Sequence, residues 1–307
     1  MTTTKSSKPN VPVICGPTAA GKTSVGIELC QSFNGEVISA DSRQFYTEMS
    51  IGTAKPTMAE MQGIPHHFID HCSVSSPITA GEFERRGEVK IQEILSRKKL
   101  PFVVGGSGLF IRSLMEGLDD LPSDENLRQE LITQYENEGL PSLWDRLDKS
   151  DHNAKKSIDH KNQVRVMRAI ELVELSGKPL AKLRDQPKTP KDFEPIWIGI
   201  SPKRDVLYKL IDQRVDQMME AGLETEVRSL VRHKNSDALK TVGYKELFSF
   251  FDGEYDREEA VRLIKRNSRH YAKRQLTWFR KIDGIKWFQP EQVDEVKEYL
   301  KSQVSEF

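Results

Sequence analysis

The chain lacks any long hydrophobic run. None of its apolar segments approaches the ~20 residues that a membrane-spanning helix needs, and residues 1–10 are polar, without the apolar core of a signal peptide. Its 307 residues, 37% hydrophobic and 30% charged, are enough for one large or two ordinary domains. We therefore expect a globular, soluble protein that is not associated with a membrane and begins with a disordered tail at residues 1–10.

The chain also contains few cysteines and has no net charge. Cys15, Cys30 and Cys72 are too few for a disulfide framework, and the first two lie in apolar segments. This usage predicts a reducing, cytoplasmic setting. The 46 basic and 46 acidic residues cancel, which argues against indiscriminate nucleic-acid binding but leaves room for a local basic patch.

A phosphate-binding motif follows the apolar run at residues 11–15. Two glycines at this spacing let the backbone wrap around an anion, and a helix that opens after the second glycine directs its N–H groups at the same anion. The lysine adds a full charge, and the threonine hydroxyl is placed to ligate Mg²⁺. Whether the phosphate is cleaved, transferred or expelled stays open at this point. The motif consists of Gly16, Pro17, Thr18, Ala19, Ala20, Gly21, Lys22 and Thr23, and we call it the phosphate loop.

Strands and helices alternate on both sides of a strand-free segment. Between residues 119 and 191 the sequence predicts only helices, at 126–138, 140–149 and 162–176, and we interpret this stretch as a helical insertion domain. Residues 11–118 and 192–307 would then form an α/β core with a parallel sheet that is covered on both faces. Its expected strands are 11–15, 36–40, 67–70, 101–104, 195–200 and 285–288, and its expected helices are 77–99, 109–115, 203–233 with a break near Gly222, and 256–281, with a turn at 241–244.

Two polar segments are candidates for chemistry. Asp41 ends the second strand, at the sheet edge where α/β proteins bind ligands, and its carboxylate could cap a helix, hold Mg²⁺ or act as a base. Residues 262–286 contain nine basic side chains with interleaved aromatics, against Asp283 alone, a composition suited to nucleic acid but also to a solvated helix face. Lys161, Arg165 and Arg168 are spaced to share one helix face.

A metal site at His66 and His67 is disfavoured. Adjacent residues of an extended segment point to opposite faces. No second cluster of cysteine or histidine is present to complete four ligands.

Several blocks of the sequence together resemble the bacterial tRNA dimethylallyltransferase family in order and spacing, over residues 11–287. Two positions depart from the family pattern: Ser107 replaces the usual Thr and keeps its hydroxyl, whereas Phe110 replaces a frequent Tyr. We expect the bacterial form, since the chain ends at Phe307 without the zinc finger of eukaryotic relatives. The blocks are 16–23, 41–46, 51–56, 65–70, 105–110, 165–171, 214–223, 242–244 and 272–280.

The resemblance implies a nucleoside-kinase-like P-loop fold and a reaction. A dimethylallyl group would move from dimethylallyl diphosphate to the exocyclic amine of the adenosine next to the tRNA anticodon, on its 3′ side. The phosphate loop with Lys22, Mg²⁺ held by Thr23, and Arg214 would stabilise the leaving diphosphate. Asp41 would be the base and Ser107 would orient the amine, and the enzyme is expected to be a monomer.

The tRNA contacts implied by the resemblance come from several segments. The basic helix at 262–281 and the insertion would grip the anticodon stem-loop, and the target base would be extruded to reach Asp41. Two alternatives stay open, namely an ATP-dependent kinase or AMP prenyltransferase on the same loop, and a non-catalytic nucleotide switch that binds RNA. The expected contacts are Asp41, Ser42, Arg43, Gln44, Ser107, Arg165, Arg168, Lys240, Gly243, Tyr244, Lys245, Lys273, Arg274, Gln275, Trp278 and Arg280.

Overall fold

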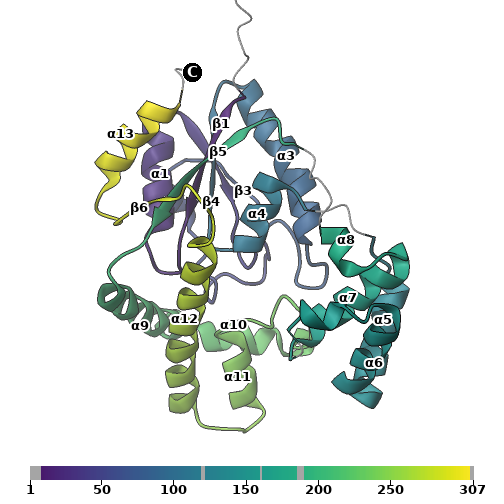
Figure 1. Ribbon diagram of the computed structural model, residues 1–307. Coiled ribbons are helices and arrows are strands. Elements are labelled where there is room, and N and C mark those ends of the chain that lie inside the picture. The colour runs from purple at the N-terminus through teal and green to yellow at the C-terminus, as the bar shows by residue number, and fades with distance from the viewer. Residues whose placement is uncertain (1–7, 119–121, 160, 185–189, 305–307) are drawn as a thin grey trace, which may run out of the picture. The chain divides into compact units, whose positions relative to one another are not determined.

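The structure, a computed structural model, describes residues 8–118, 122–159, 161–184 and 190–304 of the chain (Figure 1). The chain divides into two units, one made of Met1–Met115 with Lys191–Phe307 and the other of Glu116–Pro190. The second unit spans nearly the same residues as the strand-free segment of the sequence. The expected tail at residues 1–10 lies mostly outside the described residues, and its residue 10 already begins the first strand.

A six-stranded parallel sheet organises the first unit, as the sequence predicts. The strands run in the order β3-β2-β4-β1-β5-β6. β1 lies between β4 and β5, and its Ile14 is opposite both Val104 and Ile198. The strands are β1 (Asn10–Cys15), β2 (Gly35–Ser39), β3 (His66–His67), β4 (Leu100–Gly105), β5 (Glu194–Ile200) and β6 (Lys286–Phe288).

Helices cover both faces of this sheet (Figure 1). Because side chains alternate along a strand, Val11 and Val13 of β1 enter one hydrophobic cluster and Ile14 enters another. The first cluster includes residues of α3 (Ala80–Ser96) and α4 (Gly108–Glu116). The second includes residues of α1 (Lys22–Ser32) and α13 (Val293–Gln303). The expected covering of the sheet on both faces is confirmed.

A further group of helices packs around its own cluster in the first unit. This cluster contains Val215, Leu223, Leu247 and Ile264. Asp256 caps the longest of these helices, because its Oδ1 accepts a hydrogen bond from the Glu259 N–H at 2.8 Å. The helices are α9 (Arg204–Glu220), α10 (Leu223–Ser229), the 3₁₀ turn η2 (Val231–His233), α11 (Tyr244–Phe251) and α12 (Arg257–Phe279), and a short α2 (Met58–Met61) precedes β3.

The described residues of the second unit form helices and their connections, without a strand. Its core contains Leu131, Leu143, Leu147 and Ile170. Arg146 connects two of its helices through Glu130 and Glu174, each at 2.7 Å. The elements are α5 (Glu125–Glu138), α6 (Leu140–Ser150), the 3₁₀ turn η1 (Ala154–Lys156), α7 (Gln163–Ser176) and α8 (Leu180–Arg184).

Some expected elements differ from those found. The strand expected at 67–70 is only His66–His67, because Phe68 and Asp70 take positive φ angles of 66° and 50° and cannot continue it. The turn expected at 241–244 leads directly into α11, and α13 lies where no element was expected. Gly243 N-caps α11, with Glu246 bonded back to the Gly243 N–H at 2.7 Å, so this helix starts from a local cap.

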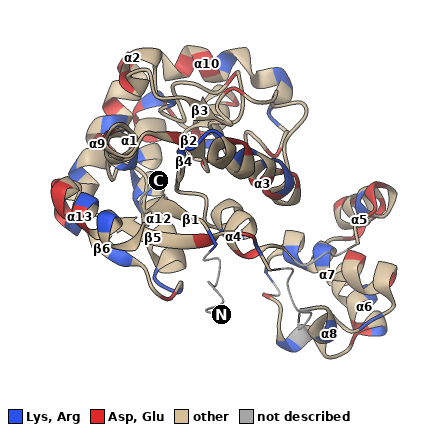
Figure 2. Cartoon of the chain, turned by 90° about the horizontal axis from the view of Figure 1, so that it is seen from above, with Lys and Arg blue, Asp and Glu red and all other residues tan. Residues whose placement is uncertain are grey.

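Charges of both signs are interspersed on several helices. Blue and red segments alternate on α3 and α13, for example (Figure 2). This fits the equal numbers of basic and acidic residues. Among the helices that the structure describes, none combines the length and apolar character needed to cross a membrane.

Candidate active site

The phosphate loop, residues 16–23, joins β1 to α1 at the carboxyl edge of the sheet. Gly16 has a φ of 149°, and a Cβ there would fall 2.2 Å from the carbonyl oxygen of Ile200, so only glycine fits. Gly21 caps α1 with a φ of 80°. The first N–H groups of a helix have no acceptor within it, and at this position they lie beside the loop. This arrangement is suited to binding phosphate.

Lys22 holds its ammonium group inside this loop. Nζ donates a hydrogen bond to the Pro17 carbonyl oxygen at 2.6 Å. Burial lowers the pKa of Lys22 to about 8; the negative charge of Asp41 opposes this shift and the positive charge of Arg214 adds to it. A bound anion would stabilise the protonated form of Lys22, so the loop gains from binding one.

Arg214 brings a second cation to the phosphate loop from α9. Its Nη2 donates to the Thr53 carbonyl oxygen at 3.1 Å. Burial lowers the pKa of this guanidinium, and the charge of Asp41 acts against the shift. Arg214 lines two cavities at the phosphate loop, and the larger, of about 670 Å³, also contains Lys22 and the exposed Thr23. Two cations and a hydroxyl therefore face one polar cavity.

Asp41 lines the narrower cavity, of about 80 Å³, together with Thr18 of the phosphate loop and Arg214. β2, which ends before Asp41, is not the neighbour of β1, since β4 lies between them. The Asp41 carboxylate nevertheless reaches the same cavity as the loop. Burial, together with the charge of Asp41, raises the pKa of Tyr271 in this cavity to about 12. The apolar lining comes from α9, α10 and α12 and includes Ile211, Val215, Met218, Leu223 and Ile264.

Ser107 follows β4 and contacts the segment that carries Asp41. Its buried Oγ accepts a hydrogen bond from the Ser42 N–H at 2.9 Å and donates one to the Ser42 hydroxyl at 3.0 Å. Asp41 itself accepts from the Arg43 N–H at 3.1 Å, which turns the chain after β2. Ser107 thus orients Ser42, and through it the turn that holds the Asp41 carboxylate.

The side chains after Asp41 are largely bonded within the protein. Arg43 donates to the carbonyl oxygens of Asp237 and Ala238 at 3.0 and 2.9 Å. Gln44 donates to the carbonyl oxygen of Thr53 at 3.2 Å, the same oxygen that accepts from Arg214. Arg43 and Gln44, expected as contacts of the target base, therefore also shape the wall of the narrower cavity.

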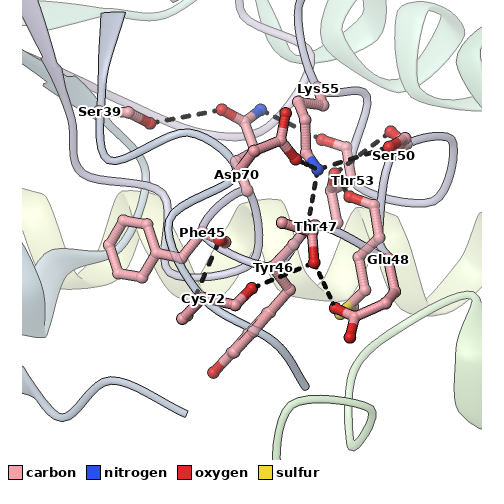
Figure 3. A network of polar contacts seen from close by, with 12 residues as sticks. Ser39, Phe45, Tyr46, Thr47, Glu48, Ser50, Thr53, Lys55, Asp70 and Cys72 are labelled. Atoms are coloured by element: carbon pink, nitrogen blue, oxygen red, sulfur yellow. Dashed lines mark hydrogen bonds and ion pairs between the residues drawn. The ribbon is translucent and has the colours of Figure 1, made fainter. Parts of the chain in front are cut away.

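Lys55 stabilises residues 46–70, which follow Asp41 in the chain, through polar contacts (Figure 3). Its side chain is only 5% exposed, and it pairs with Asp70 and donates to the Tyr46 carbonyl oxygen at 2.7 Å. In Figure 3 these groups converge on its ammonium nitrogen from both ends of residues 46–70. A buried ammonium group requires such partners. This network therefore keeps the segment in one conformation.

Glu226 of α10 is a residue that the sequence did not indicate. Its carboxylate accepts from the N–H groups of Ser50, Ile51 and Gly52 at 2.7–3.0 Å and from the Tyr244 hydroxyl at 2.6 Å. A Cβ on Gly52 would fall 2.6 Å from the Tyr244 ring, so this contact needs glycine. The glycine in block 51–56 was the available signal, but its partners lie far along the chain.

Tyr244 and Gly243, both expected to contact tRNA, are buried, and Gly243 lines the narrower cavity. Tyr244 is fully buried, and Gly243 is buried with a φ of 93° at the start of α11. Lys240 is exposed and pairs with Asp237 at 2.7 Å. Lys245 is exposed. Of these four residues only the two lysines present side chains to solvent.

The basic helix α12 has two different halves. In the first half, Lys265 pairs with Asp216 at 2.6 Å and Arg269 pairs with Asp212, so α9 neutralises charges that the sequence left unopposed. The second half forms an exposed hollow, and Arg280 follows it in exposed chain. The hollow is lined by His270, Lys273, Arg274, Thr277, Trp278 and Lys281, and we call it the basic hollow.

Gln275 of α12 is a correction to the expected tRNA contacts. It is 6% exposed, and both ends of its amide are used inside the protein. Oε1 accepts from the Thr18 N–H at 2.8 Å, and Nε2 donates to the Gly106 carbonyl oxygen at 2.9 Å. Its neighbours Lys273, Arg274 and Trp278 are exposed, as a contact with nucleic acid requires.

The basic residues expected to share one helix face in the second unit are arranged differently in the structure. Lys161 precedes α7 rather than lying on it, because Asn162 caps the helix. Arg168 pairs with the buried Glu171 at 2.6 Å and donates to the Pro122 carbonyl oxygen, so its charge is used within the unit. Arg165 is exposed. Of the two arginines expected to contact tRNA, Arg165 is the more exposed, whereas the guanidinium of Arg168 is bonded within the unit.

Phe110 and His67 take structural roles. Phe110 packs against Phe45 and Phe83, with ring centroids 5.5 Å apart in both pairs, so a ring without a hydroxyl suits this apolar position. His67 Nε2 lies 2.8 Å from a carboxylate oxygen of Glu36. Neither side chain lines the two cavities at the phosphate loop.

The similarity of this chain to known proteins shows its family. The family model described as IPP transferase matches residues 44–282. The chain belongs to the IPP transferase family. A relative named tRNA dimethylallyltransferase from Cytophaga hutchinsonii is 46% identical over 96% of this chain and 97% of its own length. One of the same name from Halalkalibacterium halodurans is 41% identical, over 96% and 95%.

Solved structures of IPP transferases share the fold. A tRNA isopentenylpyrophosphate transferase from Bacillus halodurans superposes with a TM-score of 0.72 at 39% identity, over 96% of both chains. A eukaryotic dimethylallyltransferase, described as acting on tRNA, gives a TM-score of 0.80 at 28% identity over 92% of this chain and 74% of that one. The sequence resemblance to this family is confirmed.

Proposed function

We propose that this IPP transferase moves a dimethylallyl group from dimethylallyl diphosphate to the exocyclic amine of the adenosine that follows the tRNA anticodon on its 3′ side. The chain is a tRNA-prenylating transferase by its family and its named relatives. One observation carries the finer assignment: an anion-binding loop and the Asp41 carboxylate line the same cavity. In the reaction the C–O bond to diphosphate breaks, the N–C bond forms, and the amine loses a proton.

The phosphate loop takes the donor's diphosphate. Backbone N–H groups of residues 19–23 and the charges of Lys22 and Arg214 would face the departing oxygens, whose negative charge grows as the C–O bond breaks. Both cations are already partly stripped of water, as their lowered pKa values indicate. Their interaction with the leaving group is correspondingly stronger than it would be in water.

Mg²⁺ fits this site by the chemistry of the available donors. It prefers oxygen ligands and keeps several waters beside substrate phosphates, and the exposed Thr23 hydroxyl in the larger cavity is such a ligand. When bound, the ion neutralises charge on the diphosphate. Thr23 would hold the ion, and Lys22, which lines the same cavity, would complete the charge balance.

Asp41 accepts the proton of the adenine amine. Its carboxylate lies in the narrower cavity with Arg214 and Thr18, and that cavity's apolar wall suits a dimethylallyl chain. Ser107 positions the turn that carries Asp41 through Ser42. A target base must leave its stack to enter the cavity, at a cost of a few kcal/mol.

The exposed basic residues hold the tRNA backbone. Lys273, Arg274 and Trp278 in the basic hollow offer two charges and a stacking ring. Lys240, Lys245, Arg280 and Arg165 are further exposed cations. We place the enzyme in the cytoplasm, where tRNA is available and where a reducing environment keeps Cys15, Cys30 and Cys72 free, as they are in the structure. We also propose that it acts as a monomer.

Mass spectrometry of the tRNA product tests the proposal. Unmodified tRNA is incubated with the enzyme, Mg²⁺ and dimethylallyl diphosphate, and nuclease fragments are compared with a control that lacks the donor. We expect the mass of one prenyl group to be added at the anticodon-loop adenosine. Prenylation of free AMP but not tRNA, or phosphate transfer from ATP to a small molecule, would contradict it.

A further inference from the structure

We propose that Gln275 is a positioning residue for catalysis, because its amide sets the spacing between the phosphate loop and the loop that supports Asp41. The proposal rests on the proposed function above. It concerns how fast bound substrates react rather than how tightly either of them binds.

The two hydrogen bonds of Gln275 connect opposite sides of the site. The Thr18 N–H, which donates to Oε1 at 2.8 Å, belongs to the phosphate loop. The Gly106 carbonyl oxygen, which accepts from Nε2 at 2.9 Å, precedes Ser107. Ser107 in turn holds Ser42, the neighbour of Asp41. One buried amide thus links the group that holds diphosphate to the turn that holds the base.

Close packing around the Gln275 amide limits its movement. A Cβ on Gly106 would fall 2.4 Å from Gln275 Nε2, so the loop approaches the amide as closely as glycine allows. One turn further along α12, Trp278 lies against Gly108, where a Cβ would fall 2.2 Å from its ring. α12 therefore touches residues on both sides of Ser107.

Helix α12 also packs directly on the phosphate loop. Ala19, next to Thr18, packs against a cluster that contains Ala272 of α12 with Leu207 and Ile211 of α9. The same helix presents the basic hollow on its exposed side. Helix α12 thus carries both the buried Gln275 amide and the exposed basic hollow that we propose binds tRNA.

The Gln275 amide serves both bonds at once because it carries an acceptor and a donor at any pH. Glu at position 275 would accept from the Thr18 N–H, but its ionised carboxylate would face the Gly106 carbonyl oxygen without a proton to donate. When protonated, the same carboxyl can donate to that oxygen and restore both bonds. Met, of similar length, can form neither bond.

Single-turnover kinetics of Gln275→Met and Gln275→Glu, with tRNA and donor saturating, tests the proposal. A displacement of about 1 Å between reacting groups can cost about 10²-fold in rate, and we expect a loss of that order for Gln275→Met. The dissociation constants for the anticodon stem-loop and for inorganic pyrophosphate with Mg²⁺ should change by less than about threefold, since neither contact surface is altered. Gln92→Met, on an exposed position of α3, is the matched control.

The pH dependence of Gln275→Glu separates positioning from packing. Its rate relative to wild type should rise by at least tenfold as the pH is lowered from 8 to 6, because protonation of a buried carboxyl restores the missing donor. Gln92→Glu and Gln275→Met should show no such rescue. A Gln275→Met rate within threefold of wild type, or a loss explained entirely by weaker substrate binding, would overturn the proposal. Absence of prenyl transfer by the wild-type enzyme would overturn the proposed function instead.

Discussion

The donor half and the acceptor half of the site are built in different ways. The donor half consists of the contiguous residues 16–23 with Arg214 from α9. In the proposed function it binds diphosphate through backbone groups and the half-buried cations Lys22 and Arg214. The acceptor half takes Asp41, Ser107 and Tyr271 from three separate elements. Ser107 is hydrogen-bonded to Ser42, the neighbour of Asp41, and Tyr271 lines the same cavity as Asp41. Apart from Arg214, the donor half is made by one stretch of chain, whereas the acceptor half exists only once distant elements have packed.

Asp41→Asn should impair the acceptor half of the site and leave the donor half intact. If Asp41 takes the proton from the adenine amine, turnover should fall by roughly 10²–10⁴. The binding of pyrophosphate and of tRNA should persist, because the amide keeps the shape and the oxygen that accepts from the Arg43 N–H. The single-turnover rate with saturating substrates is the measurement.

Raising the Mg²⁺ concentration provides the control for this variant. If Asp41 were instead a metal ligand, high Mg²⁺ would return the Asn variant to nearly the wild-type rate, and the base assignment would be wrong. Asp283→Asn, in an exposed turn outside both cavities, should behave as wild type throughout.

Lys22→Ala tests the donor half. Removal of one preorganised donor to a developing charge typically costs about 10²–10³ in rate, and the chemical step should suffer more than ground-state binding of the donor. Rapid-quench measurements at saturating tRNA would distinguish the two effects. A defect limited to donor affinity would leave Lys22 with a binding role alone. Lys301→Ala, exposed on α13, is the control.

The same contrast explains what the sequence could and could not predict. The parallel sheet and the glycine-rich loop between β1 and α1 depend on local patterns, namely apolar strands and glycine spacing. The sheet is confirmed and the loop is found where the glycines place it, whereas its binding of phosphate stays a prediction. The link from Thr18 to Gln275 joins residues 257 positions apart, and no local pattern contains it. The aromatic-rich α11 was missed because residues such as Tyr and Phe favour strands, while its packing against α10 and α12 decides for a helix.

Charge on α12 was misjudged for the same reason. The sequence shows an almost unopposed basic segment, but Asp212 and Asp216 of α9, more than forty residues away, neutralise its first half. The exposed face that remains is shorter than the helix. In contrast, the helical period of α13, with Val293, Val296 and Leu300 at spacings of three and four, was available in the sequence.

The two halves of α12 can therefore be tested against each other. Changing Lys273 and Arg274 together to Ala should weaken tRNA binding by about 30-fold, at about 1 kcal/mol for each phosphate that the two side chains bind. It should also reduce the slope of affinity against salt by roughly 0.7–0.9 for each phosphate that is no longer neutralised. Pyrophosphate binding should not change. The Lys265 and Arg269 double Ala variant removes two charges that α9 already neutralises, and an equal effect there would contradict our assignment.

The pH dependence of donor binding is the smallest expected effect and isolates Lys22. Its pKa is lowered to about 8, so the unliganded site loses the Lys22 charge as the pH rises through that value, while at lower pH the charge is present. The affinity for pyrophosphate with Mg²⁺ should fall by about tenfold between pH 7 and pH 9 beyond what the titration of pyrophosphate itself accounts for. Lys22→Arg provides the reference, because a guanidinium stays protonated across this range. Calorimetric titrations of both proteins at each pH give the ratio of their dissociation constants, and a ratio that stays constant up to pH 9 would mean that Lys22 is still fully charged there.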